Sequence, residues 1–416
     1  MTNEIKNVPE LRFPEFKEEW SKLKLGELAE IVRGSSPRPI SDPRWFDINS
    51  DIGWLRISDV TEQNGKITKL EQKISKDGQK KTRVLHSKHL LLSIAATVGK
   101  PVINYVKTGV HDGFLIFLRP LFDIEFMYQW LDAYRPKWKK YGQPGSQVNL
   151  NSELVKSQKI YMPHSVEQKK ISDFFSKLDQ QIELEEKKLA KLEEQKKGYM
   201  QQIFSQKLRF KNEVGKNYSE WKHETLNELN CYFTDGNYGE SYPKSDDMSN
   251  FEEGVAFLRG SNIKKGRIVL DNANYISREK HNELVSGHLY LGDIVIAVRG
   301  SLGAVGYVEK NIEGQNINSQ LAIIRTLDTK IVSRFLIYYL MSNFGQKELL
   351  SKVSGTALKQ LPLKQIKSFK TPLPENKEQD KISDFFYKLD KIINKQIKKI
   401  DRLKLRKKGF LQKMFV

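Results

Sequence analysis

The sequence has 416 residues, with 70 Lys and Arg against 51 Asp and Glu, which gives a formal net charge of +19. A chain of this length can bury two or three separate cores, and so large an excess of positive charge indicates a nucleic-acid partner. A need for solubility, or contact with an anionic membrane surface, would also account for the charge, while the single cysteine, Cys231, excludes an internal disulfide framework and a four-cysteine zinc site.

The first 18 residues are expected to form an arm, because Pro9 and Pro14 interrupt any helix there. They mix acidic, basic and proline residues and so do not resemble a secretory signal. The longest apolar runs, residues 90–98 and 294–298, are far shorter than the roughly 20 residues that span a bilayer. We therefore expect a soluble, cytoplasmic protein.

From residue 32 to about 119, short β-prone runs alternate with Gly, Pro, Asn and Asp, which predicts mixed or mainly β structure. Landmarks of this stretch return later in the chain. Residues 54–59 (Trp-Leu-Arg-Ile-Ser-Asp) match 257–262 (Phe-Leu-Arg-Gly-Ser-Asn), and residues 126–131 match 335–340, each predicted to be one packed helix. Because the residues between these landmarks differ freely, we expect two modules with one scaffold and different surfaces.

Both modules close in the same way. A short apolar strand ends at Pro163 in the first and at Pro374 in the second. The stretch 167–179 that follows then returns 211 positions later as 378–390, with only two of thirteen residues changed. This spacing is far longer than a solenoid period, so it marks two copies of a whole module, each ending in the same helix.

Within these two helices, apolar residues recur at steps of three or four, which predicts a coiled coil. Both copies place a polar residue at the same two positions of this seam, Glu185 and Lys196 in the first and Gln396 and Lys407 in the second. The apolar seam residues are Ile171, Phe174, Leu178, Ile182, Leu189, Leu192, Tyr199, Ile203, Ile382, Phe385, Leu389, Ile393, Ile400, Leu403, Phe410 and Met414.

The first helix carries an acidic face around residues 183–186, whereas the second carries a basic face over residues 395–404. A solvated surface explains any one of these charges, but the contrast between the faces favours pairing of the two helices with each other. Each helix covers about 40 residues and is therefore roughly 60 Å long, more than one turn of B-DNA at about 34 Å. We expect the helices to pack antiparallel about a pseudo-two-fold axis.

Catalytic motifs are missing from the sequence. It has no Gly-x-x-x-x-Gly-Lys-Ser/Thr loop, no zincin pair after His223-Glu224, no Asn/Asp-Pro-Pro-aromatic motif and no cofactor-type glycine fingerprint. Seven scattered histidines and one cysteine make no metal constellation. We expect a protein that is not itself an enzyme and that binds no metal or cofactor.

Three groups of residues carry a family resemblance: residues 11–16 with Trp20, the paired Glu-Gln-x-Lys-Ile-Ser-Asp-Phe-Phe helices, and the helix end 196–204 followed by 207–210. They resemble the DNA-specificity (S) subunit of type I restriction-modification systems, over nearly the whole chain and in the same order. The helix motifs are specific, whereas the module motifs are weak.

The resemblance implies an α+β fold in which two globular α/β target recognition domains are joined by two long antiparallel coiled-coil helices, with an internal pseudo-two-fold repeat. The expected division is an N-terminal arm (1–18), a first target recognition domain (19–163), a central long helix (164–207), a second target recognition domain (208–374) and a C-terminal long helix (375–416).

The resemblance also implies function and partners. Each recognition domain would read one half of a bipartite, asymmetric site in double-stranded DNA, and the helices would set the unread spacer. Two methyltransferase (M) subunits would dock on the helices and methylate an adenine in each half-site, and restriction/translocase (R) subunits would join for cleavage. Two alternatives stay open: an autonomous DNA endonuclease with unrecognised catalytic carboxylates, and a coiled-coil scaffold that binds nucleic acid without specificity.

Candidate DNA-binding residues follow from the chemistry of base reading, in which Arg or Lys contacts guanine and Asn or Gln contacts adenine, while phosphate needs only positive charge. The matched Arg56 and Arg259, each at a strand end before a turn, come first, although an arginine ion-paired inside its module is the competing interpretation. The full set is Arg33, Arg38, Arg44, Arg56, Lys100, Gln147, Asn149, Arg259, Arg299, Lys359 and Gln360.

Overall fold

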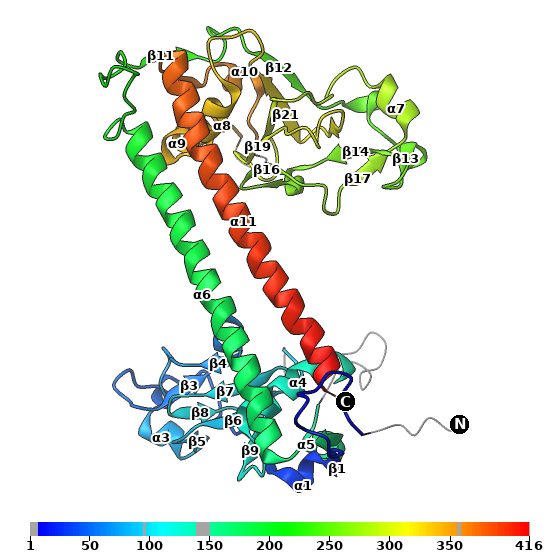
Figure 1. The fold of residues 1–416 in the computed structure, drawn as a ribbon. Helices are drawn as coiled ribbons and strands as arrows, with labels where there is room; N and C mark the ends of the chain where they lie inside the picture. The colour runs from blue at the N-terminus through cyan, green and yellow to red at the C-terminus, as the bar shows by residue number, and fades with distance from the viewer. Residues whose placement is uncertain (1–6, 95–96, 139–149, 356–358, 416) are drawn as a thin grey trace. The chain divides into compact units, whose positions relative to one another are not determined.

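The computed structural model describes residues 7–94, 97–138, 150–355 and 359–415. The chain forms two compact units, the first built from Met1–Glu186 with Lys398–Val416 and the second from Lys187–Ile397. Two long helices, α6 (Ser165–Phe204) and α11 (Asn376–Met414), are continuous and contribute one part to each unit (Figure 1).

The first unit holds a five-stranded sheet and two smaller sheets. The five-stranded sheet has the order β2-β9-β6-β7-β4, the three-stranded sheet the order β3-β8-β5, and β1 pairs with β10. The strands are β1 (Ser21–Lys24), β2 (Glu30–Arg33), β3 (Gly53–Leu55), β4 (Lys66–Ile67), β5 (Arg83–Leu85), β6 (His89–Ser93), β7 (Pro101–Asn104), β8 (Thr108–Val110), β9 (Phe114–Leu118) and β10 (Lys159–Met162).

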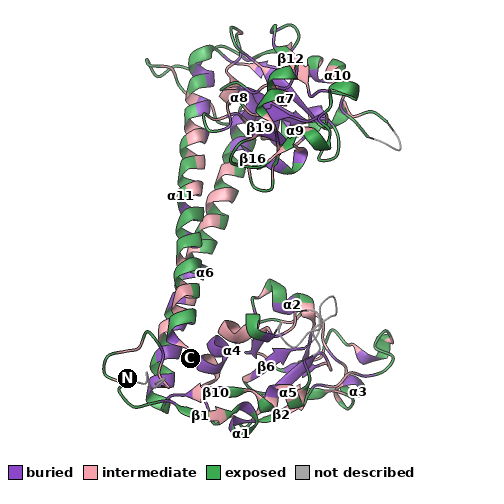
Figure 2. Cartoon of the chain, turned by 90° about the vertical axis from the view of Figure 1, so that its right-hand side faces the viewer, coloured by how far each residue is buried: buried purple, intermediate pink, exposed green. Residues whose placement is uncertain are grey.

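The described residues of this unit also form the helices α1 (Leu25–Leu28), α2 (Ile57–Glu62), α3 (Lys76–Gln79), α4 (Ile124–Trp138) and α5 (Ser152–Ser157), besides its parts of α6 and α11. The central strands β6, β7 and β9 are buried along nearly their whole length, as Figure 2 shows. One face of the sheet packs against α4 through Phe126, Trp130 and their neighbours, in a core that also contains Trp20 and Phe175. The helix predicted over residues 126–131 is therefore confirmed.

The second unit repeats this plan. Its six-stranded sheet has the order β12-β21-β18-β19-β16-β15, its four-stranded sheet the order β13-β17-β14-β20, and β11 pairs with β22. The strands are β11 (Lys222–Thr225), β12 (Tyr232–Asp235), β13 (Met248–Ser249), β14 (Val255–Leu258), β15 (Ile263–Lys264), β16 (Gly266–Ile268), β17 (Asn274–Ile276), β18 (Ile294–Ala297), β19 (Val305–Tyr307), β20 (Asn316–Ile317), β21 (Leu321–Arg325) and β22 (Lys370–Leu373).

The shorter helices of the second unit are α7 (Arg278–Glu283), α8 (Ser333–Met341), α9 (Asn343–Ser351) and α10 (Leu363–Lys367). Helix α8 packs on the main sheet through Phe335, Leu336 and Leu340, as α4 does in the first unit. The matching strands pair alike: β3 runs parallel to β8, and β14 runs parallel to β20. The internal repeat seen in the sequence is thus a repeat of topology.

The two long helices pair antiparallel within each unit. In the first, Lys407 pairs with Asp179 and Lys399 with Glu185, so the residue numbers fall along α11 as they rise along α6. In the second, Lys196 pairs with Asp390 while the ring of Tyr199 packs edge-on against Phe385. This confirms the predicted fold class, and the acidic face of α6 contacts the basic face of α11 as expected.

The apolar seam is buried both near the recognition modules and in the middle of the helices. Its buried members are Ile171, Leu178, Ile182, Ile203, Ile382, Ile393, Ile400 and Met414. Phe174, Leu189, Leu192, Phe385, Leu389, Leu403 and Phe410 are half-buried, and Tyr199 is 38% exposed. Phe175, Phe204 and Phe386, one position beside the seam, are also buried because these ends of the helices pack on the modules as well as on each other.

The described part of the N-terminal arm lies along both long helices of the first unit. The Leu11 amide donates to the Lys413 carbonyl over 2.8 Å, and Phe13 packs edge-on against Phe174. In the second unit the Leu208 amide donates in the same way to Gln202, 211 positions before Lys413, and Phe210 packs against Phe385. The Leu-Arg-Phe segment therefore docks alike in both units.

Candidate nucleic-acid interface

In the first unit, predicted DNA-binding arginines converge on Asp112, in the turn between β8 and β9. Arg33 Nε donates to the Asp112 carbonyl oxygen over 2.6 Å, and Arg38 Nη2 lies 2.9 Å from the carboxylate. The Ser36 hydroxyl bonds the other carboxylate oxygen at 2.7 Å, and this bond, with the nearby arginines, lowers the pKa of Asp112 although its burial opposes the shift. Arg38 remains 79% exposed, so its cation faces solvent.

Arg44 and Arg56 lie on either side of β3 in the sequence. The Arg44 guanidinium stacks 4.1 Å from the centre of the Trp45 ring and pairs with Asp42 at 3.0 Å. Arg56 directly follows β3, and its Nε and Nη2 lie 3.1 and 2.9 Å from the two oxygens of Asp59. This hydrogen bonding raises the pKa of Arg56, so the group is a cation at any physiological pH.

Lys100 follows Gly99, whose φ of +76° favours glycine and whose position leaves no room for a side chain against Trp138. Its ammonium donates to Asn64 Oδ1 over 2.9 Å. Burial lowers the pKa of Lys100, and the neighbouring cations of Arg135 and Lys407 lower it further, while Asp132 opposes them. Three cations, Lys100, Arg135 and Lys407, therefore lie near one another beside this glycine turn.

In the second unit, Arg259 and Arg299 flank one turn, residues 318–320. The Asn318 amide donates to the Leu258 carbonyl, directly before Arg259, over 2.9 Å, and the Arg299 amide donates to Gln320 over 3.3 Å. Arg299 is exposed and its guanidinium lies 5.3 Å from the centre of the Tyr238 ring. Two arginines of the predicted set thus meet at one edge of the second unit.

The same edge borders a pocket of about 290 Å³ lined by Asp235, Tyr238, Arg299 and Gln360 together with apolar residues. Two predicted residues, Arg299 and Gln360, are therefore brought together here. Lys359 is exposed next to Gln360. Gln147 and Asn149, the matching pair of the first unit, lie outside the described residues.

These two edges offer hydrogen-bond donors and positive charge at the ends of buried strands. Guanidinium groups can bond phosphate oxygens or the O6 and N7 atoms of guanine, and amide side chains can bond adenine. The first edge holds its arginines beside carboxylates, whereas the second exposes Arg299 without an ion pair among the described residues. The chemistry fits a nucleic-acid surface that differs between the units.

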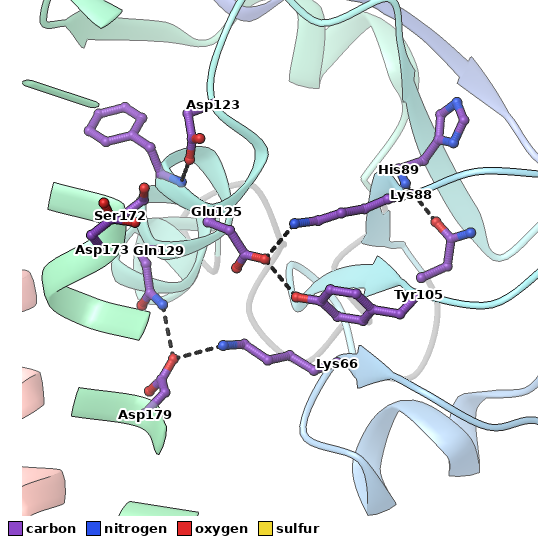
Figure 3. A network of polar contacts seen from close by, with 12 residues as sticks. Lys66, Lys88, His89, Tyr105, Asp123, Glu125, Gln129, Ser172, Asp173 and Asp179 are labelled. Atoms are coloured by element: carbon purple, nitrogen blue, oxygen red, sulfur yellow. Dashed lines mark hydrogen bonds and ion pairs between the residues drawn. The ribbon is translucent and has the colours of Figure 1, made fainter. Parts of the chain in front are cut away.

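A second set of polar groups joins each module to the helices. In the first unit, the Asp179 carboxylate of α6 accepts from Lys66 at 3.1 Å, from Gln129 at 3.0 Å and from Lys407 of α11 at 2.7 Å (Figure 3 shows the first two). Burial raises the pKa of Asp179, but the two lysines outweigh burial and bring it below the usual range. One carboxylate thus connects the sheet, α4 and both long helices.

The second unit has the same junction at Asp390, 211 positions later. Its carboxylate accepts from Lys196 of α6 at 2.7 Å and from the Tyr338 hydroxyl of α8 at 2.9 Å. Arg267, which matches Lys66 in the repeat, donates to the Asp390 carbonyl at 3.5 Å. The polar seam residues Lys196 and Lys407 therefore form equivalent ion pairs between the long helices in the two units.

The arm and the repeated helix also form matching ion pairs. Arg12 bonds Glu167 at 2.7 and 2.8 Å, and the Trp20 indole donates to the same carboxylate at 3.2 Å. Arg209 bonds Glu378 at 3.1 and 2.7 Å, and Trp221 donates to it at 2.9 Å. Both glutamates are buried, so each tryptophan is held in its core by a paired charge.

Sequence reasoning missed Asp179, Asp390 and the two buried glutamates, as well as Tyr238. The signal was present for the four acidic residues, because all of them lie inside the repeated segments 167–179 and 378–390. An acidic residue that recurs in both long helices, together with a seam lysine that also recurs, indicates an ion pair between the two helices. Tyr238 has no counterpart motif in the sequence that would have singled it out.

Two further observations concern the described residues as a whole. They contain no group of three or more His, Cys, Asp or Glu side chains placed to hold a metal ion. Within the same residues, no helix is both long and apolar enough to cross a membrane.

The sequence is similar to known proteins over nearly its full length. It is 22% identical to the specificity subunit of the type I restriction enzyme MjaVIII of Methanocaldococcus jannaschii, covering 98% of this chain and 94% of that protein. It is 26% identical to the putative type I restriction enzyme MjaX specificity subunit of the same organism, covering 97% of this chain and 95% of the other.

The fold is similar to solved structures of the same kind. The type I restriction-modification S subunit of M. genitalium matches with a TM-score of 0.59 at 16% identity, covering 98% of this chain and 99% of that one. A chain from a structure of the type I R-M system matches with a TM-score of 0.57 at 17% identity, covering 96% and 98%. The model of the type I restriction modification DNA specificity domain matches twice, at residues 17–194 and 218–402, and the chain belongs to this family.

Proposed function

We propose that this chain gives a type I restriction-modification complex its DNA specificity, with each recognition module reading one half of a bipartite, asymmetric site in double-stranded DNA. The observation that carries the proposal is the pair of arginine-bearing edges, one in each unit, built at the same place on a repeated scaffold. Family membership and the net charge of +19 support it.

The two target recognition domains of this proposal are residues 19–163 and 208–374, with the arm at 1–18 and the long helices at 164–207 and 375–416. Specificity for two different half-sites follows from the difference between the edges. Arg33, Arg38 and Arg44 lie beside Asp112 or Asp42 in the first, whereas Arg299, Tyr238 and Gln360 border a pocket in the second. Different donors and acceptors favour different base pairs.

The proposed DNA contacts are the candidates named from the sequence. Exposed members, such as Arg38, Arg299 and Lys359, present their charge to solvent and suit phosphate or base contacts. Arg56 is the exception among these candidates, because two hydrogen bonds hold its guanidinium on Asp59. Gln147 and Asn149, which lie outside the described residues, complete the proposed set.

In this proposal the long helices set the unread spacer and dock two methyltransferase (M) subunits. The catalytic steps belong to these and to restriction/translocase (R) subunits, and the chain itself is a non-catalytic, cytoplasmic component without a cofactor. The partly buried junctions at Asp179 and Asp390 support the spacer role of the helices, because they tie each module to both helices.

The experiment is to map adenine methylation in cells that express this chain together with the methyltransferase subunit of the same type I complex. A motif of two specified parts with a gap of fixed length supports the proposal. Cells that express the methyltransferase subunit alone are the control and should show no such motif. Cleavage of DNA by the purified chain alone, or a folded complex that methylates without a motif, would overturn it.

A further inference from the structure

The matched segments 54–59 and 257–262 place an arginine at the same point of each unit, but differ three residues later. Arg56 and Arg259 each follow a buried strand, β3 or β14, and begin a short helical turn. The turn is capped by a side chain that accepts the backbone N–H of the arginine, that of Asp59 in the first unit and that of Asn262 in the second. The cap is therefore charged in one unit and neutral in the other.

In the first unit the charged cap binds its arginine. Asp59 accepts the Arg56 backbone amide at 2.8 Å and both Nε and Nη2 of its guanidinium, and Asp59 itself is only 3% exposed. Turning Arg56 toward another partner would leave a buried carboxylate without its counter-charge, which is strongly unfavourable. Arg56 is therefore committed to its own module.

In the second unit the neutral cap forms no hydrogen bond with the guanidinium. Asn262 accepts the Arg259 amide at 3.0 Å, and its Nδ2 donates to the Val269 and Asp271 carbonyls at 3.0 and 3.3 Å. Arg259 Nη2 donates to the Asn272 carbonyl over 3.2 Å, while its Nε is buried with no hydrogen-bond partner among the described residues. One carbonyl holds this cation, and no carboxylate pairs with it in the described part of the chain.

A second carboxylate of the first edge is also replaced. Ile94 donates its amide to Gly113, and Val298 donates in the same way to Gln320, which aligns the turn at Asp112 with the turn at Ser319. The serine has no charge, and the Tyr238 hydroxyl donates to its carbonyl at 3.0 Å. Asp235 lines the neighbouring pocket, but no ion pair within the described residues joins it to Arg259 or Arg299. Among the described residues, the second edge thus carries two arginines that form no ion pair with a carboxylate.

Resting on the function proposed above, we infer that Arg259 contacts DNA in the second half-site, and that Arg56 instead stabilises the first module. Releasing Arg259 from its place breaks one hydrogen bond to a neutral carbonyl and frees a buried N–H that has no acceptor. A DNA phosphate or the O6 and N7 atoms of guanine supply the missing acceptors, and a phosphate also supplies the counter-charge. Arg299, across the 318–320 turn, extends the same cationic edge.

The test gives the second unit the charged cap of the first. The chain, in complex with its methyltransferase subunits, is made as Asn262→Asp, Arg259→Ala and the double variant. Each complex is titrated against a duplex that carries the wild-type methylation motif, at one fixed salt concentration. Lys310→Ala, which removes an exposed cation elsewhere on the second unit, is the matched control.

We expect Asn262→Asp and Arg259→Ala each to weaken binding about ten-fold or more, the range for one lost arginine contact, and Lys310→Ala to stay near wild type. The double variant should bind no more weakly than Arg259→Ala, because the new carboxylate acts by capturing the arginine. Additive losses would mean that the carboxylate repels DNA by itself and would overturn the capture mechanism. Wild-type affinity in a folded Arg259→Ala complex overturns the inference altogether.

Arg259→Lys separates the two kinds of DNA contact, since lysine keeps the charge and loses the bidentate fork. Loss of discrimination at one base pair indicates guanine reading, and retained affinity with unchanged discrimination indicates a phosphate contact. Arg56→Ala should lower the unfolding temperature by stranding Asp59. If the wild-type complex yields no bipartite motif, the proposed function fails; if the motif is present and the variants bind normally, only this inference fails.

Discussion

Lys407, near the end of α11, lies 2.7 Å from the carboxylate of Asp179 in α6. The equivalent residues 211 positions away, Lys196 and Asp390, form the same pair at the same distance with the two helices exchanged. A polar pair at one position of an apolar seam fixes the register and orientation of coiled-coil helices. The repeated ion pair therefore defines how α6 and α11 meet within each unit.

Asp179→Ala should destabilise the first unit by about 2–3 kcal/mol, because it leaves Lys407 and Lys66 without a shared acceptor in a largely buried place. Chemical denaturation of the full chain measures this loss. Lys404→Ala, which breaks an exposed pair with Glu186, is the control and should change stability by no more than about 0.5 kcal/mol. Equal effects of the two variants would show that the buried junction has no special weight.

The same carboxylate predicts a pH dependence. The pKa of Asp179 is lowered in the folded chain, so its contribution to stability is fully present above the unfolded value of about 3.9 and is lost as the pH falls through the folded value. Unfolding midpoints measured from pH 6 down to pH 3 should fall less steeply for Asp179→Asn than for the wild type. Parallel curves would contradict the assignment.

Arg12 and Arg209 predict local effects. Among the described residues, Arg12→Ala leaves the buried Glu167 with Trp20 as its one side-chain donor, and Arg209→Ala leaves Glu378 with Trp221. Each change should cost about 2–4 kcal/mol, and hydrogen exchange should speed up in the altered unit only. Faster exchange in both units after a single change would show that the two buried pairs are not independent.

Lengthening both helices tests their proposed role as the spacer. Seven residues inserted after Ala190 and seven after Asp401 keep the heptad register and add about 10 Å to each helix. At about 3.4 Å per base pair, the gap in the methylated motif should grow by about three base pairs. Insertion into α6 alone disturbs the pairing and serves as the contrast. An unchanged gap with retained methylation would remove the helices from this role.

Much of the architecture was predictable because the sequence contains two copies of the same module. The seam from Ile171 to Met414 and the closing strands before Pro163 and Pro374 repeat at a spacing of 211 residues. The packed helices around Phe126 and Phe335 repeat at 209 residues. Apolar periodicity reports burial directly, and a repeat removes the ambiguity of a single short pattern.

The candidate site was less predictable, since it depends on pairings between distant residues. Arg56 and Arg259 look equivalent in sequence, but Asp59 pairs with Arg56 whereas Asn262 does not bond the Arg259 guanidinium. This difference becomes visible only in the side-chain geometry. The convergence of Arg33 and Arg38 on Asp112, more than 70 residues away, leaves no local pattern either. Surface residues that are free to diverge carry no periodicity from which their pairing could be predicted.

The most direct test makes the two recognition modules identical. Residues 208–374 are replaced by residues 11–163, so that Arg12 takes the place of Arg209 beside Glu378. The segments are joined where the closing strand of each module meets the same repeated helix, and methylation is mapped with the partner methyltransferase. The proposed function has each module read one half-site, with the two modules related by a pseudo-two-fold axis. The motif should then become an inverted repeat of the wild-type first half-site with the same gap. An unchanged asymmetric motif from the folded chimera would contradict the account.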